Sequence, residues 1–322
     1  MSMMKRVRSI GSEYWRSHNY REDKTAAAFV ASHRCPALTR EEKAEIDRYW
    51  AAYHVRFRDY DWYRMFYAVT GIHDPRYIPH PFAVEVLYRY YKKMSFSVAY
   101  ADKNMFTTFQ PQLKFPTAIG KRVNGRYYDA EGTYHGETVS DALAEKIYAA
   151  FLANSEGRIR DVILKVAVGS GFGKGVQKFA VSSREDIKRI LTENDVKNLI
   201  LQMAVQQHPF FARLNPDSVN IIRITTWRVD DQVYFFSPCI RFGIRGSHTD
   251  VAFRDGKEIL NILKIDPSGR VSDRYVTLDG EHKDLPADAD RTVPCWKEIL
   301  ETVRTGALHL DYFDIVAWDH GG

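Results

Sequence analysis

The sequence predicts an α+β fold with antiparallel sheets, preceded by a helical region. Residues 1–94 show helical periodicity and helix-capping patterns, whereas short alternating strands, tight turns and single amphipathic helices follow from residue 95. Hydrophobic residues make up 45% and charged residues 27% of the 322-residue chain, as in soluble globular proteins. We therefore expect a helical region over 1–94, an α/β part over 95–160 and a larger α+β part over 161–322.

In the N-terminal region, Thr39 and Glu42 have the spacing of a capping box and predict a helix over 39–57. A second helical run over 82–94 follows a proline-rich link at 73–81. Tyr and Trp side chains recur at helical spacing between residues 49 and 67. We interpret them as core, with an aromatic ligand surface as the alternative.

Between residues 95 and 160, a short helix is expected over 101–109, a hairpin over 115–129 and an amphipathic helix over 140–154. Asn124-Gly125 is the dipeptide typical of a two-residue hairpin turn.

The remainder of the chain alternates strands and helices. A strand starting at Ile163 leads into a glycine-rich loop, and Ser183 or Ser182 caps the next helix. Two strands are joined by an Asp230-Asp231 turn. The expected helices cover 183–194 and 293–308, and the expected β segments cover 198–205, 218–229, 232–244, 257–278 and 313–318.

Composition excludes several classes of protein. The net charge is +5 with acids and bases interspersed, so no clustered basic face predicts nucleic-acid binding. No apolar run approaches about 18 residues, so no membrane span is expected, and the N-terminus lacks the apolar region of a signal peptide. Cys35, Cys239 and Cys295 lie far apart without a CxxC, which favours buried, reduced thiols in a cytoplasmic protein.

The segment 163–176, ILKVAVGSGFGKGV, combines a short apolar strand with a glycine-rich loop. Glycine occupies every second position, at Gly169, Gly171, Gly173 and Gly175. In an extended chain one face would then be bare backbone, and the other would carry Ser170, Phe172 and Lys174. Bare N–H groups beside Lys165 and Lys174 can hold a polyphosphate. The P-loop, dinucleotide and kinase patterns do not match, so a glycine hairpin without ligand is the alternative.

Asn220 and Arg223 follow a polar turn and lie on a predicted strand. Their odd spacing places them on opposite faces of a regular strand, so a bulge or a strand end would be needed for both to reach one ligand. An arginine among apolar strand residues should be paired or functional, because burial of an unpaired guanidinium is unfavourable.

The segment 198–227, with ADKNMF at 101–106 and IRFGIRGS at 240–247, resembles the sugar-transfer-associated ATP-grasp family. Matching segments run from Arg76 to Asp319. The resemblance implies an ATP-grasp fold, in which two α+β subdomains sandwich ATP. Residues 95–160 would then be the N-terminal α/β part of this unit, and 161–322 its nucleotide-binding and catalytic subdomains. Most such enzymes activate a carboxylate as an acyl phosphate, and a few are kinases.

The resemblance also implies an ATP site. Lys103 matches the first ATP-contacting lysine of the fold, with a surface lysine as the alternative. Lys165 matches the second, the strand lysine that reaches the phosphates. The lid over the β- and γ-phosphates matches the loop with Gly169, Ser170, Gly171, Gly173, Lys174 and Gly175. The hinge that meets adenine matches Gln202, Met203, Ala204 and Val205. Gln207 or His208 would lie near the ribose, with a structural histidine as the alternative for His208.

On the catalytic side, the resemblance implies that Arg223 faces the transferred phosphate with Asn220 beside it, unless Asn220 is a turn cap. Arg241 matches either a ligand of the substrate carboxylate or a structural ion-pair partner. Asp319 matches the first of the carboxylates that hold Mg²⁺. Lysine, arginine and Mg²⁺ suit this chemistry because charge develops on the oxygens of the transferred phosphoryl group.

There are two departures from the family pattern, one on the acceptor side of the site and one at its metal-binding end. Asp250 stands where the family has Asp, but Val251 replaces the following Asn. A Glu-x-Asn that completes the metal site in the family does not occur between Asp319 and Gly322. We therefore expect either that the sequence is a fragment or a natural truncation, or that the protein has lost catalysis, because a single carboxylate holds Mg²⁺ weakly.

Three functions are compatible with these features. The first is an ATP- and Mg²⁺-dependent ligase that joins a carboxylate to an amine or thiol in exopolysaccharide, capsule or glycoconjugate synthesis. The second is a sugar or small-molecule kinase of the same fold. The third is a non-catalytic ATP-binding scaffold that acts with glycosyltransferases. A small-molecule carboxylate or a sugar-linked substrate is the expected ligand besides ATP.

Overall fold

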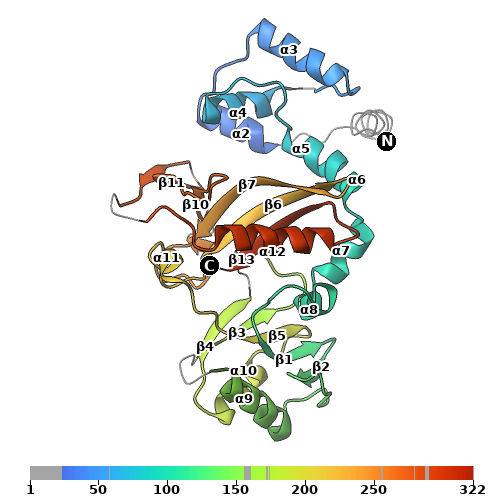
Figure 1. Ribbon diagram of the computed structural model, residues 1–322, viewed down its shortest axis with the longest axis vertical. Coiled ribbons are helices and arrows are strands. Elements are labelled where there is room, and N and C mark those ends of the chain that lie inside the picture. Colours follow the sequence, from blue (N-terminus) through green and yellow to red (C-terminus); the bar gives the residue numbers. More distant parts are fainter. Residues whose placement is uncertain are drawn as a thin grey trace. The chain divides into compact units, whose positions relative to one another are not determined.

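The computed structural model describes residues 24–57, 59–155, 161–171, 173, 175–254, 257–278, 280–286 and 290–321. The chain divides into two compact units, Met1–Met94 and Ser95–Gly322. Figure 1 shows a first unit made of helices and a second unit that combines sheets and helices.

Helices account for the regular structure described in the first unit. Thr39 starts α3 with the predicted capping box, since its hydroxyl accepts from Glu42 N–H at 3.1 Å and its own N–H donates to Glu42 Oε2 at 2.7 Å. α3 ends earlier than predicted, because the chain turns at His54 with a φ of +59°. The elements are α2 (Lys24–Ser32), α3 (Arg40–Ala51), α4 (Asp61–Thr70), α5 (His80–Phe82), the π-helical η1 (Ala83–Tyr88) and α6 (Arg89–Tyr91).

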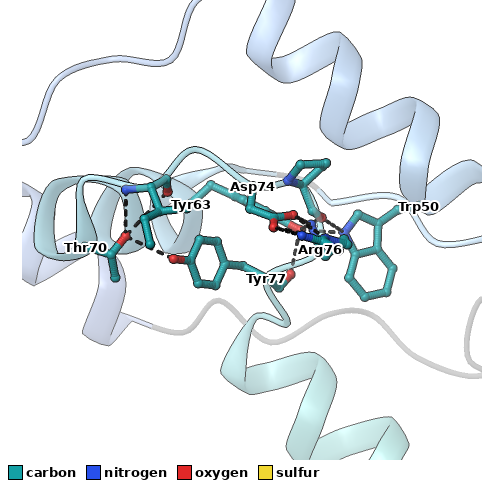
Figure 2. Close-up of polar contacts among 8 residues, drawn as sticks. Trp50, Tyr63, Thr70, Asp74, Arg76 and Tyr77 are labelled. Carbon is teal, nitrogen blue, oxygen red and sulfur yellow. Dashed lines mark hydrogen bonds and ion pairs between the residues drawn. The ribbon is translucent and has the colours of Figure 1, made fainter.

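The aromatic stripe forms the core of this unit. Trp50, Tyr63 and Tyr67 are buried, which confirms the interpretation of these residues as core. Trp50 Nε1 donates to Tyr63 Oη at 2.5 Å and to Pro75 O at 2.8 Å (Figure 2). Tyr63 Oη in turn donates to Tyr77 O at 2.8 Å (Figure 2). These bonds attach the proline-rich link to α3 and α4.

The first sheet of the second unit is antiparallel, with strand order β2-β1-β5-β3-β4. Asn124 and Gly125 form the predicted hairpin turn between β1 and β2, both with positive φ. The sheet joins residues 118–129 to residues 161–203, so the predicted division at 160 falls within one sheet. Its strands are β1 (Ala118–Val123), β2 (Arg126–Asp129), β3 (Asp161–Val166), β4 (Val176–Ala180) and β5 (Leu199–Met203).

One face of this sheet is covered by α9 (Asp141–Ser155) and α10 (Arg184–Glu193), below the strands in Figure 1. Leu164 and Leu201 lie opposite each other and point into the core on this face. Lys165 and Ile200 also lie opposite each other, and strand alternation places them on the face away from α9 and α10. We call this face the open face. Ser183, one of the two predicted caps, starts α10 with a capping box.

Short helices precede this sheet. They are α7 (Met94–Tyr100), the 3₁₀ helix η2 (Lys103–Met105) and α8 (Phe106–Phe109). Asp102 caps η2 by accepting from Asn104 N–H at 2.9 Å, so the predicted helix over 101–109 forms in two shorter pieces.

The second sheet has the order β12-β11-β10-β7-β6-β13 and pairs antiparallel throughout. Asp230 and Asp231 form the predicted β6–β7 turn, both with positive φ. The strands are β6 (Ile221–Val229), β7 (Gln232–Phe242), β10 (Asn261–Lys264), β11 (Arg274–Thr277), β12 (His282–Asp284) and β13 (Ile315–Gly321); β8 (Ala252–Arg254) and β9 (Lys257–Ile259) form a separate hairpin.

Apolar residues of one face of the second sheet pack with α11 (Pro209–Ala212) and α12 (Trp296–Leu308). Ile222 and Ile240 lie opposite each other on this face. Arg223, Cys239 and Asp319 occupy adjoining positions of β6, β7 and β13 on the opposite face, which we call the polar face.

Two further expectations concern composition. Within the described residues, no helix is long and apolar enough to cross a membrane.

Cys35 is buried and Cys239 is partly buried, but Cys295 is exposed, so the prediction of buried thiols is wrong for Cys295. Cys295 lies at the start of α12, outside the hydrophobic core, with a φ of +53°.

We predict that Tyr63→Phe loosens the first unit, because it leaves Tyr77 O without its buried donor. The expected destabilisation is about 1–2 kcal/mol, which corresponds to roughly 5- to 30-fold faster hydrogen exchange of amides in α3 and α4. Tyr90→Phe is the matched control, since Tyr90 is 44% exposed, and it should change exchange little. Equal exchange in the Tyr63 variant and the wild type would contradict the role of this bond.

Candidate functional site

Two lysines lie close together at the open face of the first sheet. Burial lowers the pKa of Lys165 below its usual 10.5, and the nearby Lys103 ammonium lowers it further. Among the described residues, the Lys165 ammonium has no hydrogen-bond or ion-pair partner. Burial also lowers the pKa of Lys103, against an opposing effect of Asp102. A pair of partly buried cations without a carboxylate between them fits an anionic ligand.

Lys103 connects η2 to the glycine-rich loop. Its Nζ donates to Val166 O at 3.2 Å, to Ser170 O at 3.2 Å and to Ser170 Oγ at 2.9 Å. Ser170 Oγ also donates to Val166 O at 2.6 Å. Lys103 and Ser170 therefore hold the start of the loop against the end of β3.

The glycine-rich loop is folded, and the expectation of an extended chain is wrong. Gly169, Gly173 and Gly175 have φ values of +71°, +72° and +70°, which L-residues with side chains rarely adopt. Phe172 and Lys174 lie outside the described residues, so the prediction for Lys174 stays a prediction. Gly171 is exposed.

Gly173 brings the loop against the segment that follows β7. A Cβ atom at Gly173 would lie 2.7 Å from Thr249 Oγ1, so only glycine allows this close approach. A Cβ atom at Gly175 would similarly lie 2.6 Å from Val166 Cγ2. The loop thus contacts β3 on one side and the segment around Thr249 on the other.

The predicted hinge follows β5. Gln202 Nε2 donates to Pro116 O at 3.1 Å, and the Met203 side chain packs in the core. The backbone N–H groups of Met203 and Ala204 donate to Thr117 O and Asp161 O. Val205 is 43% exposed, and its N–H has no acceptor within the described part of the chain. Of the four predicted hinge residues, Val205 alone offers a free N–H there.

Gln207 and His208 hold the chain locally. Gln207 Oε1 accepts from Asn220 N–H at 2.5 Å, and its Nε2 donates to Ser218 O at 3.0 Å. His208 caps α11, because its Nδ1 accepts from Phe210 N–H at 3.1 Å. These contacts correspond to the structural alternative for His208, and they give Gln207 a structural role as well.

Asn220 is completely buried next to the start of β6. Its Nδ2 donates to Phe211 O at 2.7 Å and to Asn215 O at 2.9 Å, and its Oδ1 accepts from Ser218 Oγ at 2.8 Å. The bulge in this hairpin occurs between Arg223 and Thr225, where it does not bring Asn220 to the polar face. The structure therefore does not bring Asn220 and Arg223 together, and the hydrogen bonds of Asn220 match the alternative of a turn cap.

Arg223 and Asp319 are brought together. They lie opposite each other on β6 and β13, and Arg223 donates Nε and Nη2 to the two carboxylate oxygens at 2.7 and 2.6 Å. This bidentate bond to Asp319 raises the pKa of Arg223, with burial opposing it. The pair is partly exposed, so both groups remain accessible on the polar face.

A second ion pair lies deeper. Arg241 Nη2 is 2.9 Å from Asp250 Oδ2, with the Arg241 side chain only 8% exposed. Although this distance is short, Asp250 Oδ2 and Arg241 Nε have no aligned hydrogen-bond partner. Burial raises the pKa of Asp250, and Arg241 opposes this shift. The geometry matches the structural ion-pair alternative for Arg241.

The metal site predicted at Asp319 has few donors. Among the described residues, no group of three His, Cys, Asp or Glu side chains could hold a metal ion. Both oxygens of Asp319 already accept hydrogen bonds from Arg223. The described residues thus do not complete a Mg²⁺ site by themselves.

The sequence did not predict that Lys121 lies at the site. Lys121 lies opposite Ile200, which lies opposite Lys165, so all three share the open face. Alternation alone would group Lys121 with the buried Ile119. A bulge between Ala118 and Gly120 breaks that alternation, and no sequence signal reveals it.

We predict that Asn220→Ala acts on stability. It would remove three buried hydrogen bonds, those from Asn220 Nδ2 to Phe211 O and Asn215 O and that from Ser218 Oγ to Asn220 Oδ1, which costs about 2 kcal/mol or more in the free energy of unfolding. Asn154→Ala, on the exposed surface of α9, is the matched control and should cost less than about 1 kcal/mol. Urea denaturation measures both. An Asn220 variant of unchanged stability with impaired ligand turnover would instead favour the catalytic assignment.

Comparison with known proteins gives a family. Residues 84–320 match the family described as sugar-transfer-associated ATP-grasp. A search of curated proteins gives no match. Carboxyaminoimidazole ribonucleotide synthase from Aspergillus clavatus, solved with ATP, is similar at 12% identity over 69% of this chain and 42% of that chain, with a TM-score of 0.37. D-alanyl-alanine synthetase A from Vibrio cholerae is similar at 11% identity over 66% and 65%, with a TM-score of 0.27.

This chain thus spans less than two thirds of the length of either solved structure. The family match covers more than half of the chain and includes both sheets. The protein therefore belongs to the sugar-transfer-associated ATP-grasp family.

Proposed function

We propose that this protein binds ATP on the open face of the first sheet and uses it to activate a carboxylate for attack by an amine or thiol. The observation that carries the proposal is the Lys165 ammonium, partly buried beside Lys103 and without a partner among the described residues. A polyphosphate would supply the missing negative charge.

The surrounding residues support the placement of such a ligand. Val205 N–H lies two residues beyond the end of β5 and three residues beyond Gln202, which pairs with Ile163, and it can meet the adenine. Lys165 lies one further row along the open face, where the phosphates would then lie. The folded glycine-rich loop, with Gly173 against Thr249, would cover them.

The proposed chemistry uses the polar face of the second sheet. An oxygen of the acceptor carboxylate attacks the terminal phosphorus while the bond to the leaving ADP oxygen breaks. The amine then attacks the acyl carbon, phosphate leaves, and the amine proton passes to solvent. Arg223 would stabilise charge on the transferred phosphoryl oxygens after exchanging Asp319 for the ligand. Mg²⁺ bound with ATP would neutralise phosphate charge, and Asp319 remains its predicted ligand.

Two alternative functions would give different products from ATP and the acceptor. A kinase of the same fold would leave the phosphate on the acceptor. A non-catalytic ATP-binding scaffold acting with glycosyltransferases would bind ATP without turnover. A role in polysaccharide or glycoconjugate synthesis in the cytoplasm is part of the proposal and is supported by the family description.

We predict that Lys165→Met weakens ATP binding at least tenfold, because a charge-assisted contact to phosphate is lost. In the wild type, ATP should raise the lowered pKa of Lys165. Binding at alkaline pH should therefore take up a proton, and affinity should fall as the pH rises through the pKa of the unliganded lysine.

Calorimetry in buffers of different ionisation enthalpy measures both effects. Lys146→Met is the matched control, since Lys146 lies exposed on α9, the helix that covers the opposite face of the sheet. A Lys165 variant that binds ATP like the wild type would overturn the site.

We further predict that ATP with a suitable acid and hydroxylamine yields ADP, phosphate and a hydroxamate, because hydroxylamine captures acyl phosphates. Arg223→Gln should lower this turnover about a hundredfold while ATP still binds. Phosphorus NMR identifies the products. Phosphate retained on the acceptor would indicate the kinase, and ATP binding without any turnover across a broad panel of acids would favour the scaffold.

A further inference from the structure

A hollow of about 370 Å³ lies between the glycine-rich loop and the segment after β7. Gly173 borders it on one side, and residues 244–253 line the other. Ile244, Val251 and the half-exposed Phe253 form an apolar wall. Arg245 carries the one charged side chain among the described residues of this lining.

Arg245 is presented by a tight turn. Ser247 N–H donates to Ile244 O at 3.0 Å, and Gly246 has a φ of +85°, which places Arg245 at the corner. Asp217 Oδ2 accepts from Gly246 N–H at 2.8 Å and so anchors the turn through its backbone. Arg245 is exposed, and its guanidinium has no ion-pair or hydrogen-bond partner in the described part of the chain.

The family pattern suggests Arg241 as a ligand of a substrate carboxylate. Unlike Arg245, Arg241 is not free to bind a ligand. Its side chain is 8% exposed and lies against Asp250. Recruiting Arg241 would leave the partly buried Asp250 carboxylate without its cation, which is strongly unfavourable. Arg245, four residues further along the chain, has a guanidinium that is free as far as the structure is described.

The glycine-rich loop closes one side of the hollow. Gly173 touches Thr249, which lies on the hollow's rim and donates its hydroxyl to Val251 O at 2.6 Å. If the loop covers the phosphates of ATP, as the proposed function requires, then the hollow lies next to the terminal phosphate. A molecule in the hollow would be placed for phosphoryl transfer.

We propose that this hollow is the acceptor site and that Arg245 binds the carboxylate of a sugar acid of monosaccharide size. The inference rests on the proposed function, whose carboxylate substrate it specifies. A guanidinium fork holds a carboxylate through two parallel hydrogen bonds, and the apolar wall packs against the carbon skeleton. The family's association with sugar transfer supports a sugar as that skeleton.

The test is a calorimetric titration of the full chain with glucuronate, galacturonate and N-acetylneuraminate, with glucose and galactose as neutral probes. A non-hydrolysable ATP analogue is present at saturation. At least one acid should bind the wild type, and Arg245→Gln should weaken it about ten- to a hundredfold. Arg245→Lys should restore part of the affinity, because it keeps the charge but not the fork.

Arg270→Gln is the matched control, since Arg270 is an exposed arginine that lines a different hollow, and it should leave acid binding unchanged. Affinity for the ATP analogue and thermal stability should stay the same in both variants. Acid binding that survives Arg245→Gln, neutral sugars that bind as well as acids, or no acid binding to nucleotide-loaded wild type would overturn the acceptor site.

Failure of the ATP analogue to bind the wild type would count against the proposed function instead. The acids are then titrated without nucleotide, where dependence on Arg245 can still be measured. If an acid binds in a way that depends on Arg245 but no nucleotide binds, Arg245 still recognises the carboxylate, and the proposed reaction of that carboxylate with ATP is rejected.

Discussion

The uncompensated charge of Lys165 is the constraint on which the rest of the site depends. Its ammonium is partly buried next to that of Lys103, and both have lowered pKa values because burial disfavours the charged form. Lys103 offsets part of the unfavourable desolvation of its ammonium by donating to Val166 O at the end of β3 and to Ser170 O in the glycine-rich loop. These bonds also hold the start of that loop in place. Lys165 has no comparable partner among the described residues, and an anionic ligand would compensate its positive charge.

The two sheets differ in how their charged side chains are paired. On the open face of the first sheet, Lys165 has no carboxylate partner among the described residues and Asp161 pairs with Lys178, whereas the second sheet pairs Arg223 with Asp319 and Arg241 with Asp250. A ligand can therefore meet the first sheet without breaking an ion pair but must compete with Asp319 for Arg223. This difference explains why we place nucleotide binding on the first sheet and assign the chemistry, with its change of partners, to the second.

Local patterns predicted the elements well where neighbouring residues decide the structure. The capping box of Thr39, the Asn124-Gly125 turn and the cap at Ser183 all depend on contacts within a few residues, and all three occur. The glycine-rich loop was predicted to be extended, but positive φ angles fold it back, since glycine permits both conformations equally. Sequence spacing did separate Asn220 from Arg223, but whether Asn220 was a turn cap depended on its distant partner Phe211 O.

The sequence by itself indicated the family, a helical start followed by mixed helices and strands, and Lys103 and Lys165 as candidate ligands of ATP. Only the tertiary structure decided which charged groups are compensated, because ion pairs such as Arg223–Asp319 join residues from distant parts of the chain. It also decided that Arg241 pairs with Asp250, that Arg245 has no partner within the described ranges, and that a bulge brings Lys121 to the open face. These outcomes follow from strand register and burial, which local sequence patterns do not encode.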